Sequence, residues 1–299
     1  NYLPLFHTAG INLHTLPTLF QGGTVIVLPG FDADAIVALL EAERLDTIFA
    51  VPTVYQELLD HPRFGDVPLG RVRHWGCGGA PLPDRLVARC RTLGIRICNG
   101  MGMTETGPTA FLAAPEHAWD RIGSVGRPQL LVSVRIVDGR GRDVADGEVG
   151  DLLFSGPAVT PGYWNDPEAT RAAFTGDGWL RSGDLARRDA DGFYYVAGRR
   201  KEMFISGGEN VYPAEVENVL AAHPAVTEAA VIAAADPKWG EVGRAFVQLS
   251  AAAPPPGAPE LEAFCRSRLA AYKVPRSFVF VPDFPRTAAG KVQKHLLGS

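Results

Sequence analysis

The sequence predicts an α/β protein of three parts: a mainly parallel α/β portion at 1–120, a small antiparallel β-barrel-like subdomain at 121–200, and an α+β C-terminal domain at 201–299. Strand and helix patterns alternate through the first part, as they do in parallel sheets covered by helices. The second part has short strands separated by Gly and Asp turns. The third part mixes both patterns over about 100 residues, a usual size for an independent domain.

The first part begins with a loop and an apolar segment, followed by a predicted strand at 24–28. Apolar residues then recur at helical spacing over 32–46, with Asp32 or Asp34 as the helix cap. Strand and helix patterns alternate over 47–99, which indicates a mainly parallel sheet. Ligands of such sheets bind at the carboxyl ends of the strands.

Two glycine-rich loops are expected at those strand ends, GCGGAP at 76–81 and NGMGMTETG at 99–107. Glycines let the backbone approach a flat base or a phosphate closely. Thr104 offers a hydroxyl to a phosphate oxygen, and Glu105 offers a hard oxygen to Mg²⁺. The pattern suits a nucleotide, although glycine loops after strands are mostly structural.

The later elements follow from turn and helix signals. Short alternating strands predict the small antiparallel subdomain up to residue 198, with a hairpin turn at 191–192. Pro213 opens a helix in the C-terminal part. Its apolar face leaves Glu215 and Glu217 outside the apolar stripe.

Charge and cysteine usage narrow the classes of partner. The net charge is −4 and no block of Lys and Arg forms a basic stripe, which argues against nucleic acid. The four cysteines have no paired spacing, which argues against a zinc knuckle or a disulfide framework and favours a reducing compartment. The sequence shows neither a signal peptide nor an apolar run of about 20 residues, so we expect a cytoplasmic protein without a membrane span. The oligomeric state stays open.

Five motifs then occur in one order: NGMGMTETG, GEVGDLLFSGPAVTPGYWNDPEAT, GWLRSGDLARRDADGFYYVAGRRKE, SGGENVYPAEVE and PRTAAGKVQK. Together they resemble the acyl-adenylate-forming (AMP-binding) superfamily, in its acyl-CoA synthetase or acid:CoA ligase branch. The resemblance covers essentially the whole chain. It implies a two-step reaction in which a carboxylate attacks the α-phosphate of Mg·ATP to give acyl-AMP and pyrophosphate, and the thiol of CoA then displaces AMP. It also implies a mobile C-terminal domain that rotates between the two steps.

The resemblance assigns the nucleotide site residue by residue. The expected adenine and acyl-pocket residues are Gly78, Gly79, Ala80, Pro81, Asn99, Gly100, Met101, Gly102 and Met103. Thr104 is expected to contact phosphate and Glu105 to hold Mg²⁺. Asp184 is expected to accept hydrogen bonds from the ribose hydroxyls, with Arg199 supporting the same sugar. Lys291 matches the mobile catalytic lysine, and a point cation between two anions would stabilise the developing charge.

The resemblance also assigns the hinge and the CoA site. Lys201 matches the hinge position, although it also reads as a solvated surface lysine. The expected wall of the pantetheine tunnel is Ser206, Gly207, Gly208 and Glu209. Trp239, with Tyr272, is a candidate surface for the adenine of CoA, and core packing explains such an aromatic residue equally well.

His7 bears on the choice of acid. Amino-acid-activating relatives carry an Asp near this position, whereas PLFHTAG has no carboxylate. Fatty-acyl and aryl-acid CoA ligases have a similar histidine that gates the acyl pocket, so a fatty or aryl carboxylic acid is expected. On position alone, His7 reads as a core or interface histidine. The length of the acyl chain stays open.

Two departures from the family's pattern limit the interpretation. Met101 stands where many relatives carry an aromatic residue, so thioether contact would replace stacking on adenine. The Ser/Thr/Gly-rich phosphate loop is absent, so we expect residues 1–299 to be inactive alone and to form the later part of a longer enzyme. Two alternatives remain: an adenylating enzyme whose acceptor is carrier-protein pantetheine or oxygen, and a non-catalytic fragment that acts as a binding module.

Overall fold

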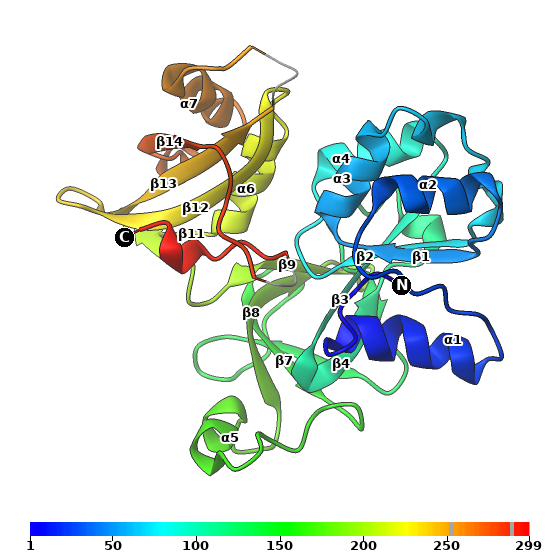
Figure 1. Cartoon of the computed structure of the whole chain (residues 1–299). Helices are drawn as coiled ribbons and strands as arrows, with labels where there is room; N and C mark the ends of the chain where they lie inside the picture. The colour runs from blue at the N-terminus through cyan, green and yellow to red at the C-terminus, as the bar shows by residue number, and fades with distance from the viewer. Residues whose placement is uncertain (251–253, 288–289, 299) are drawn as a thin grey trace. The chain divides into compact units, whose positions relative to one another are not determined.

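The computed structural model describes residues 1–250, 254–287 and 290–298 (Figure 1). The chain divides into two units. The first comprises Asn1–Ser182 and Arg187–Tyr195, and the second comprises Gly183–Ala186 and Val196–Ser299. The division therefore assigns short pieces of two strands in the middle of the chain to the C-terminal unit. It does not test a hinge at residue 201, which stays a prediction.

A five-stranded sheet of order β1-β2-β3-β4-β5 organises the first unit. β1 (Thr47–Ala50), β2 (His74–Gly78) and β3 (Ile97–Met103) pair in parallel, which confirms the predicted parallel sheet for these strands. β4 (Gly107–Leu112) and β5 (Arg127–Pro128) then continue the sheet in antiparallel pairing. The sheet is therefore mixed.

The helices of this unit begin and end where local signals predict. In α2 (Ala33–Glu41), the side chain of Asp32 accepts a hydrogen bond of 3.0 Å from the amide of Ala35, so Asp32 is the cap. α3 (Pro52–Asp60) and α4 (Asp84–Thr92) follow β1 and β2 (Figure 1). The buried side chains that join the helices to the sheet include Val37, Leu40, Tyr55, Leu58, Trp75, Leu86 and Ile97.

The first residues differ from the prediction. A π-helix, η1 (Ala9–Thr15), runs into α1 (Leu16–Phe20). The strand predicted at 24–28 is not part of a sheet. Asn1 instead exchanges backbone hydrogen bonds of 2.6 and 2.9 Å with this segment, so a single residue takes the place of a neighbouring strand.

A second sheet, of order β6-β7-β8-β9, occupies the region of the predicted small antiparallel subdomain. β6 (Ser133–Val137) and β7 (Gly150–Ser155) are antiparallel. A short helix, α5 (Pro167–Ala173), separates them from β8 (Leu180–Arg188) and β9 (Tyr194–Arg199).

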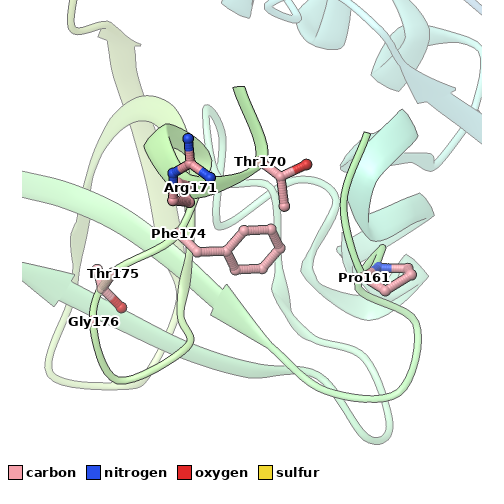
Figure 2. A pocket seen from close by; sticks show the side chains of 6 residues that line it. All are labelled: Pro161, Thr170, Arg171, Phe174, Thr175 and Gly176. Carbon is pink, nitrogen blue, oxygen red and sulfur yellow. The ribbon is translucent and has the colours of Figure 1, made fainter. Parts of the chain in front are cut away.

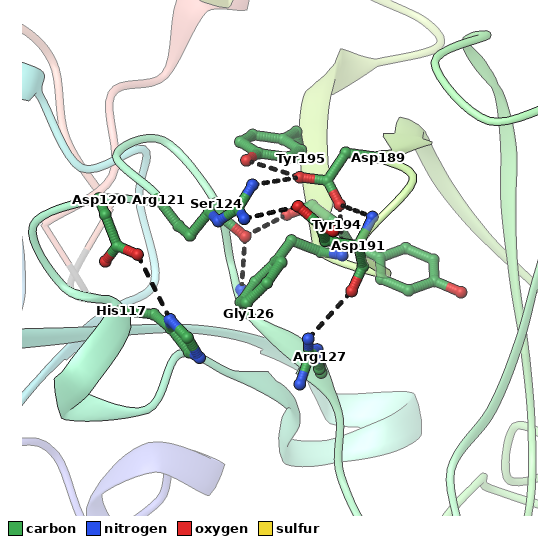
Figure 3. A network of polar contacts seen from close by, with 11 residues as sticks. His117, Asp120, Arg121, Ser124, Gly126, Arg127, Asp189, Asp191, Tyr194 and Tyr195 are labelled. Atoms are coloured by element: carbon green, nitrogen blue, oxygen red, sulfur yellow. Dashed lines mark hydrogen bonds and ion pairs between the residues drawn. The ribbon is translucent and has the colours of Figure 1, made fainter.

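Polar contacts fix the turn between β8 and β9 (Figure 3). The amide of Gly192 donates to the carbonyl of Asp189 at 3.0 Å, which confirms the predicted turn at 191–192. Arg121 pairs with Asp189 at 3.4 Å and with Asp191 at 2.6 Å. Ser124 donates from its hydroxyl to the carbonyl of Tyr194 at 2.9 Å. Two residues of the segment that follows β4, Arg121 and Ser124, therefore bind the end of the β8–β9 hairpin.

The second unit contains a sheet of order β11-β10-β13-β12, with β14 paired to β13. Its strands are β10 (Phe204–Ser206), β11 (Glu209–Val211), β12 (Val226–Asp236), β13 (Gly240–Leu249) and β14 (Ser277–Val281). β13 and β14 are parallel, and the other pairs are antiparallel.

Two helices complete this unit, α6 (Pro213–Ala221) and α7 (Ala258–Arg266). Pro213 is at the first helical position, as predicted. The core between helices and sheet contains Phe204, Val211, Val216, Leu220, Val231, Val247, Leu261 and Cys265. Glu217, which helical spacing placed outside the apolar stripe of α6, has only 16% of its side chain exposed.

Short 3₁₀-helices connect these elements: η2 (Phe64–Asp66), η3 (Leu69–Arg71), η4 (Thr104–Thr106), η5 (Pro115–His117), η6 (Ala271–Lys273) and η7 (Lys294–Leu296). Among the described residues, no helix combines the length and the apolar character needed to cross a membrane.

All four cysteines are buried and carry free thiols. Burial raises the pKa of Cys90 to about 12 and those of Cys98 and Cys265 to about 11. Burial raises the pKa of Cys77 further still. A thiol reacts as its thiolate, so we expect these side chains to be unreactive at neutral pH.

Candidate active site

The two glycine-rich segments lie at the carboxyl ends of β2 and β3, as expected. However, residues 99–103 form the end of β3 and not a loop. The reason is that β4 folds back along β3, so that Gly100 pairs with Leu112 and Met101 with Phe111. The prediction missed this strand because three small or flexible residues in succession resemble a turn.

Several of these glycines serve close packing between strands. A Cβ atom on Gly78 would lie 2.8 Å from the carbonyl oxygen of Gly100. A Cβ atom on Gly102 would lie 2.2 Å from the carbonyl oxygen of Pro108. Close packing between strands therefore explains why glycine is present at Gly78 and Gly102, without contact to a nucleotide.

The neighbouring residues differ in exposure. Gly79, Ala80 and Pro81 are exposed just beyond β2, so their surfaces are open to a ligand. Asn99 is buried, and its side-chain amide donates to the carbonyl of Ser124 at 2.9 Å. Met101 is partly buried.

Thr104 and Glu105 lie in η4, between β3 and β4. The hydroxyl of Tyr163 donates to Oε1 of Glu105 at 2.8 Å. The backbone carbonyl of Glu105 accepts from the amide of Thr160 at 2.7 Å. Tyr163 was not predicted, because it comes 58 residues later in a loop. Its hydrogen bond raises the pKa of the Tyr163 phenol and fixes the carboxylate.

The chemistry of Glu105 fits Mg²⁺ that is held largely by phosphate and water. Mg²⁺ is commonly bound through one or two carboxylates together with the phosphates of a nucleotide. Within the described ranges, no group of three or more His, Cys, Asp or Glu could hold a metal ion without such a partner. Glu105 therefore fits the role of one Mg²⁺ ligand among oxygens that a nucleotide would supply, and this role stays a prediction.

Two of the cavities among the described residues lie in the first unit, and their lining contains no predicted site residue. One of about 510 Å³ is lined by Pro161, Thr170, Arg171, Phe174, Thr175 and Gly176 (Figure 2). The other, of about 280 Å³, lies among residues 69–75, 93–96 and Pro115. These two cavities are therefore separate from the predicted site.

In the second unit, three predicted residues come together. Asp184 is 5% exposed, and its Oδ1 lies 3.0 Å from Nε of Arg199. Burial raises the pKa of Asp184, while Arg199 and Lys291 oppose that shift. Burial also lowers the pKa of Lys291, as does the nearby Arg199, while Asp184 raises it. One carboxylate thus lies within electrostatic range of two cations.

Lys291 is held by the backbone around it. The amide of Thr287 donates to the carbonyl of Lys291 at 2.8 Å, and the amide of Lys291 donates to Oγ1 of Thr287 at 3.2 Å. Arg286 and Val292 form an antiparallel bridge. Arg286 also forms an ion pair with Glu228 on β12. Backbone hydrogen bonds to Thr287 and the ion pair of Arg286 thus attach the segment around Lys291 to the sheet.

The predicted CoA residues form a second group. Ser206 ends β10, and Gly207 and Gly208 form its turn into β11 with φ of +60° and +90°, a region that favours glycine. The amide of Gly207 donates to the carbonyl of Trp239 at 2.9 Å. A Cβ atom on Gly207 would lie 2.8 Å from Cε3 of Trp239. The Trp239 ring therefore rests against this turn, with 38% of the residue exposed.

The described surroundings of His7, Lys201 and Tyr272 do not test their expected roles. Nδ1 of His7 accepts from the amide of Ala9 at 3.2 Å, which is a local interaction. Lys201 is exposed in the turn after β9. Tyr272 is 36% exposed in η6. Their expected roles stay predictions.

Sequence reasoning missed one cluster completely. Nζ of Lys294 lies 2.7 Å from Oε1 of Glu217 and 2.8 Å from Oε2 of Glu202. The same Oε1 of Glu217 accepts from the amide of Val231 at 2.7 Å. The partners of Lys294 lie far away in the sequence, so local patterns could not predict this cluster.

Family models and relatives identify the family of the chain. The model described as AMP-binding enzyme matches residues 1–164, and the one described as AMP-binding enzyme C-terminal domain matches residues 215–291. A feruloyl-CoA synthase of Amycolatopsis sp is 45% identical over 291 residues, which cover 97% of this chain and 59% of the relative.

Two solved structures are similar over nearly the whole chain. The O-succinylbenzoate coenzyme A synthetase of Bacillus subtilis, in complex with ATP and magnesium ion, has a TM-score of 0.89 and 36% identity, covering 100% of this chain and 61% of that one. An amide bond synthetase of Marinactinospora thermotolerans has a TM-score of 0.88 and 34% identity, covering 94% of this chain and 58% of that one.

The chain thus spans 58% to 61% of the length of these three proteins. The α/β fold of the chain is that of adenylate-forming enzymes. Since the first family model alone matches more than half of its residues, the chain belongs to the AMP-binding enzyme family.

Proposed function

We propose that the protein containing residues 1–299 is an AMP-forming acid:CoA ligase. It activates a fatty or aryl carboxylic acid with ATP to give acyl-AMP and pyrophosphate. It then transfers the acyl group to the thiol of CoA and releases AMP. Family membership and the acid:CoA ligase relatives support this function. The observation that carries it is the grouping of Asp184, Arg199 and Lys291 in one unit.

This grouping suits the first half-reaction. A buried carboxylate can accept hydrogen bonds from two ribose hydroxyls, and such bonds to a charged group are strong. Arg199 opposes the rise in the pKa of Asp184, and its Nε, 3.0 Å from Oδ1, orients the carboxylate. Lys291 then places one ammonium where the substrate carboxylate and the α-phosphate must meet, which offsets their repulsion. Mg²⁺, which would be held by Glu105 and the nucleotide, supplies charge neutralisation at the phosphates.

The second half-reaction would use the turn at 206–208. Two glycines and the face of Trp239 form a surface without protruding side chains, which suits the narrow pantetheine arm of CoA. An aromatic ring that is 38% exposed offers a stacking face to adenine. Lys238, whose Nζ lies 4.8 Å from the centre of this ring, adds a cation near the phosphates.

The test uses the full-length protein that contains this chain. ATP–pyrophosphate exchange measures the first step, and mass spectrometry of acyl-CoA measures the second, with ferulate, indole-3-acetate, O-succinylbenzoate and fatty acids as substrates. We expect exchange and acyl-CoA with at least one acid. If no acid supports exchange, the enzyme proposal fails and a binding role for the fold takes its place.

We further propose that residues 1–299 alone do not catalyse exchange, because the sequence lacks the phosphate loop of the family. The nucleotide would then bind through ribose and adenine contacts only. Isothermal titration of AMP and ATP against this chain should give similar affinities for both. Measurable exchange by purified 1–299 would contradict this proposal.

A second acceptor is favoured by one observation, the likeness to an amide bond synthetase. In that case an amine, and not a thiol, would take the acyl group from acyl-AMP. Competition between CoA and a panel of amines, followed by mass spectrometry, separates the two functions. A thioester as main product supports the ligase, and an amide supports the second candidate. A thioester formed only on a carrier protein would instead identify carrier-protein pantetheine as the acceptor.

A further inference from the structure

The group formed by Lys294, Glu202 and Glu217, here the carboxylate–lysine triad, is not used by the proposed chemistry. Its three side chains are largely covered, with 20%, 32% and 16% exposed respectively. The single ammonium of Lys294 lies 2.8 Å from Glu202 and 2.7 Å from Glu217. The electrostatic attraction within an ion pair that is largely covered by protein is screened by salt far less than the attraction within an exposed pair.

The triad joins three separate segments. Glu202 directly follows the expected hinge residue Lys201. Glu217 lies on α6 and also accepts from the amide of Val231 on β12, so it is fixed to the core of the unit. Lys294 begins η7, three residues after Lys291. The ammonium of Lys294 thus connects the segment after β9, helix α6 and the segment that carries Lys291.

The other attachment of that segment lies on its opposite side. Arg286, which precedes Lys291, pairs with Glu228 on β12. Lys294, which follows Lys291, pairs with Glu202 and Glu217. Lys291 therefore lies between two ionic attachments in the sequence. Loss of the second would leave the Lys291 segment with the Arg286 ion pair and its backbone bridge alone, and a less firmly held side chain spends less time in reactive geometry.

We propose that Lys294 is a positioning residue for Lys291, and that it makes the residue after the hinge and the Lys291 segment move as one body. This inference rests on the proposed function, because it assigns Lys291 to the adenylation step. Rotation about Lys201 would then be transmitted through Glu202 and Lys294 directly to Lys291. Lys294 would affect how often Lys291 is correctly placed and not how ATP binds.

The same helix offers a matched control. Nζ of Lys273 lies 2.7 Å from Oε1 of Glu215, two residues before Glu217 on α6. Its side chain is 19% exposed, against 20% for Lys294. Both lysines therefore anchor another segment to α6 with similar geometry and burial. Only Lys294 is connected to the Lys291 segment.

The experiment compares Lys294→Met with Lys273→Met in the full-length protein. For Lys294→Met we expect kcat for ATP–pyrophosphate exchange to fall roughly tenfold or more while KM for ATP changes less than about twofold. Thioester formation from supplied acyl-AMP should change less than about twofold, because that step does not need Lys291. Lys273→Met should leave the kcat of both steps within about twofold of wild type.

A structural readout makes the result independent of activity. Hydrogen exchange of peptides from 290–298 should be faster in Lys294→Met and unchanged in Lys273→Met. Lys294→Arg should restore both readouts in part, because it keeps a cation between the carboxylates. Glu202→Gln is the milder second variant if Lys294→Met fails to fold, since it leaves the pair with Glu217 in place.

Two results would overturn the proposal: equal losses of exchange in the two lysine variants, or unchanged hydrogen exchange at 290–298 in Lys294→Met. If the wild-type protein shows no pyrophosphate exchange, the proposed function fails. The hydrogen-exchange comparison still decides in that case whether Lys294 anchors the segment.

Discussion

The turn between β10 and β11 allows a prediction with an internal control. Gly207 and Gly208 both have positive φ, +60° and +90°. A Cβ atom on Gly207 would lie 2.8 Å from Cε3 and 3.1 Å from Cζ3 of Trp239, whereas a Cβ atom on Gly208 would meet nothing within 4 Å. Gly208→Ala therefore tests the strain of the backbone, and Gly207→Ala tests the same strain together with a clash.

The expected losses follow from these geometries. An L residue in the left-handed region costs about 1–2 kcal/mol of unfolding free energy, and both variants bear this cost. Overpacking adds about 1–3 kcal/mol, and the lower end applies here because the Trp239 ring is 38% exposed and can move outward. We therefore expect Gly207→Ala to be less stable than Gly208→Ala by about 1 kcal/mol.

The assay must report on the second unit alone, because a chain of two units does not unfold in one step. Hydrogen exchange in increasing urea, followed on peptides from β12 and β13, measures the unfolding free energy of that unit. The double variant Gly207→Ala/Trp239→Ala should recover about 1 kcal/mol relative to the sum of the single variants. Equal stabilities of the two alanine variants, or strict additivity in the double variant, would refute the contact between Gly207 and Trp239.

Further expectations concern the nucleotide site. Lys291→Ala should lower ATP–pyrophosphate exchange about 10²–10³-fold and spare thioester formation from supplied acyl-AMP; equal losses would contradict its role. Because burial lowers the pKa of Lys291 below the usual 10.5 and the ammonium is the active form, exchange should decline as pH rises through that lowered pKa. The pH–rate profile of Lys291→Arg should lack this alkaline decline. Asp184→Asn should weaken AMP binding by about 1.5–3 kcal/mol in titration calorimetry, through loss of charged hydrogen bonds; unchanged affinity would remove Asp184 from the ribose site. Tyr163→Phe removes a neutral donor from Glu105, so the Mg²⁺ concentration for half-maximal exchange should rise by a factor that corresponds to about 0.5–1.5 kcal/mol.

Local signals predicted much of the fold. The cap at Asp32, the helix that begins at Pro213 and the turn at 191–192 each depend on residues within one or two turns of chain, and all three were confirmed. The alternation of strand and helix patterns along the chain predicted the parallel pairing of β1, β2 and β3. The family and its α/β fold followed from motif order, because several spaced motifs rarely coincide by chance.

What the sequence could not predict depends on partners that are distant along the chain. Residues 99–103 became a strand because β4 returned to pair with them. The segment 24–28 stayed outside a sheet because Asn1 took its hydrogen bonds. Glu217 is largely covered, and Lys294, 77 positions later, supplies a cation beside it. Helical periodicity describes which face of a helix is apolar, and it contains no information about a charged partner from another segment.

The four buried thiols have a practical consequence for measuring motion in this protein. Since each is covered and has a raised pKa, maleimide reagents at neutral pH should leave them unmodified. A pair of cysteines introduced at exposed positions away from the proposed site, such as Ala42 in the first unit and Ala222 in the second, could then carry donor and acceptor dyes without removal of any native cysteine. Single-molecule energy transfer between such dyes would test the predicted rotation of the C-terminal domain, with the native interior intact.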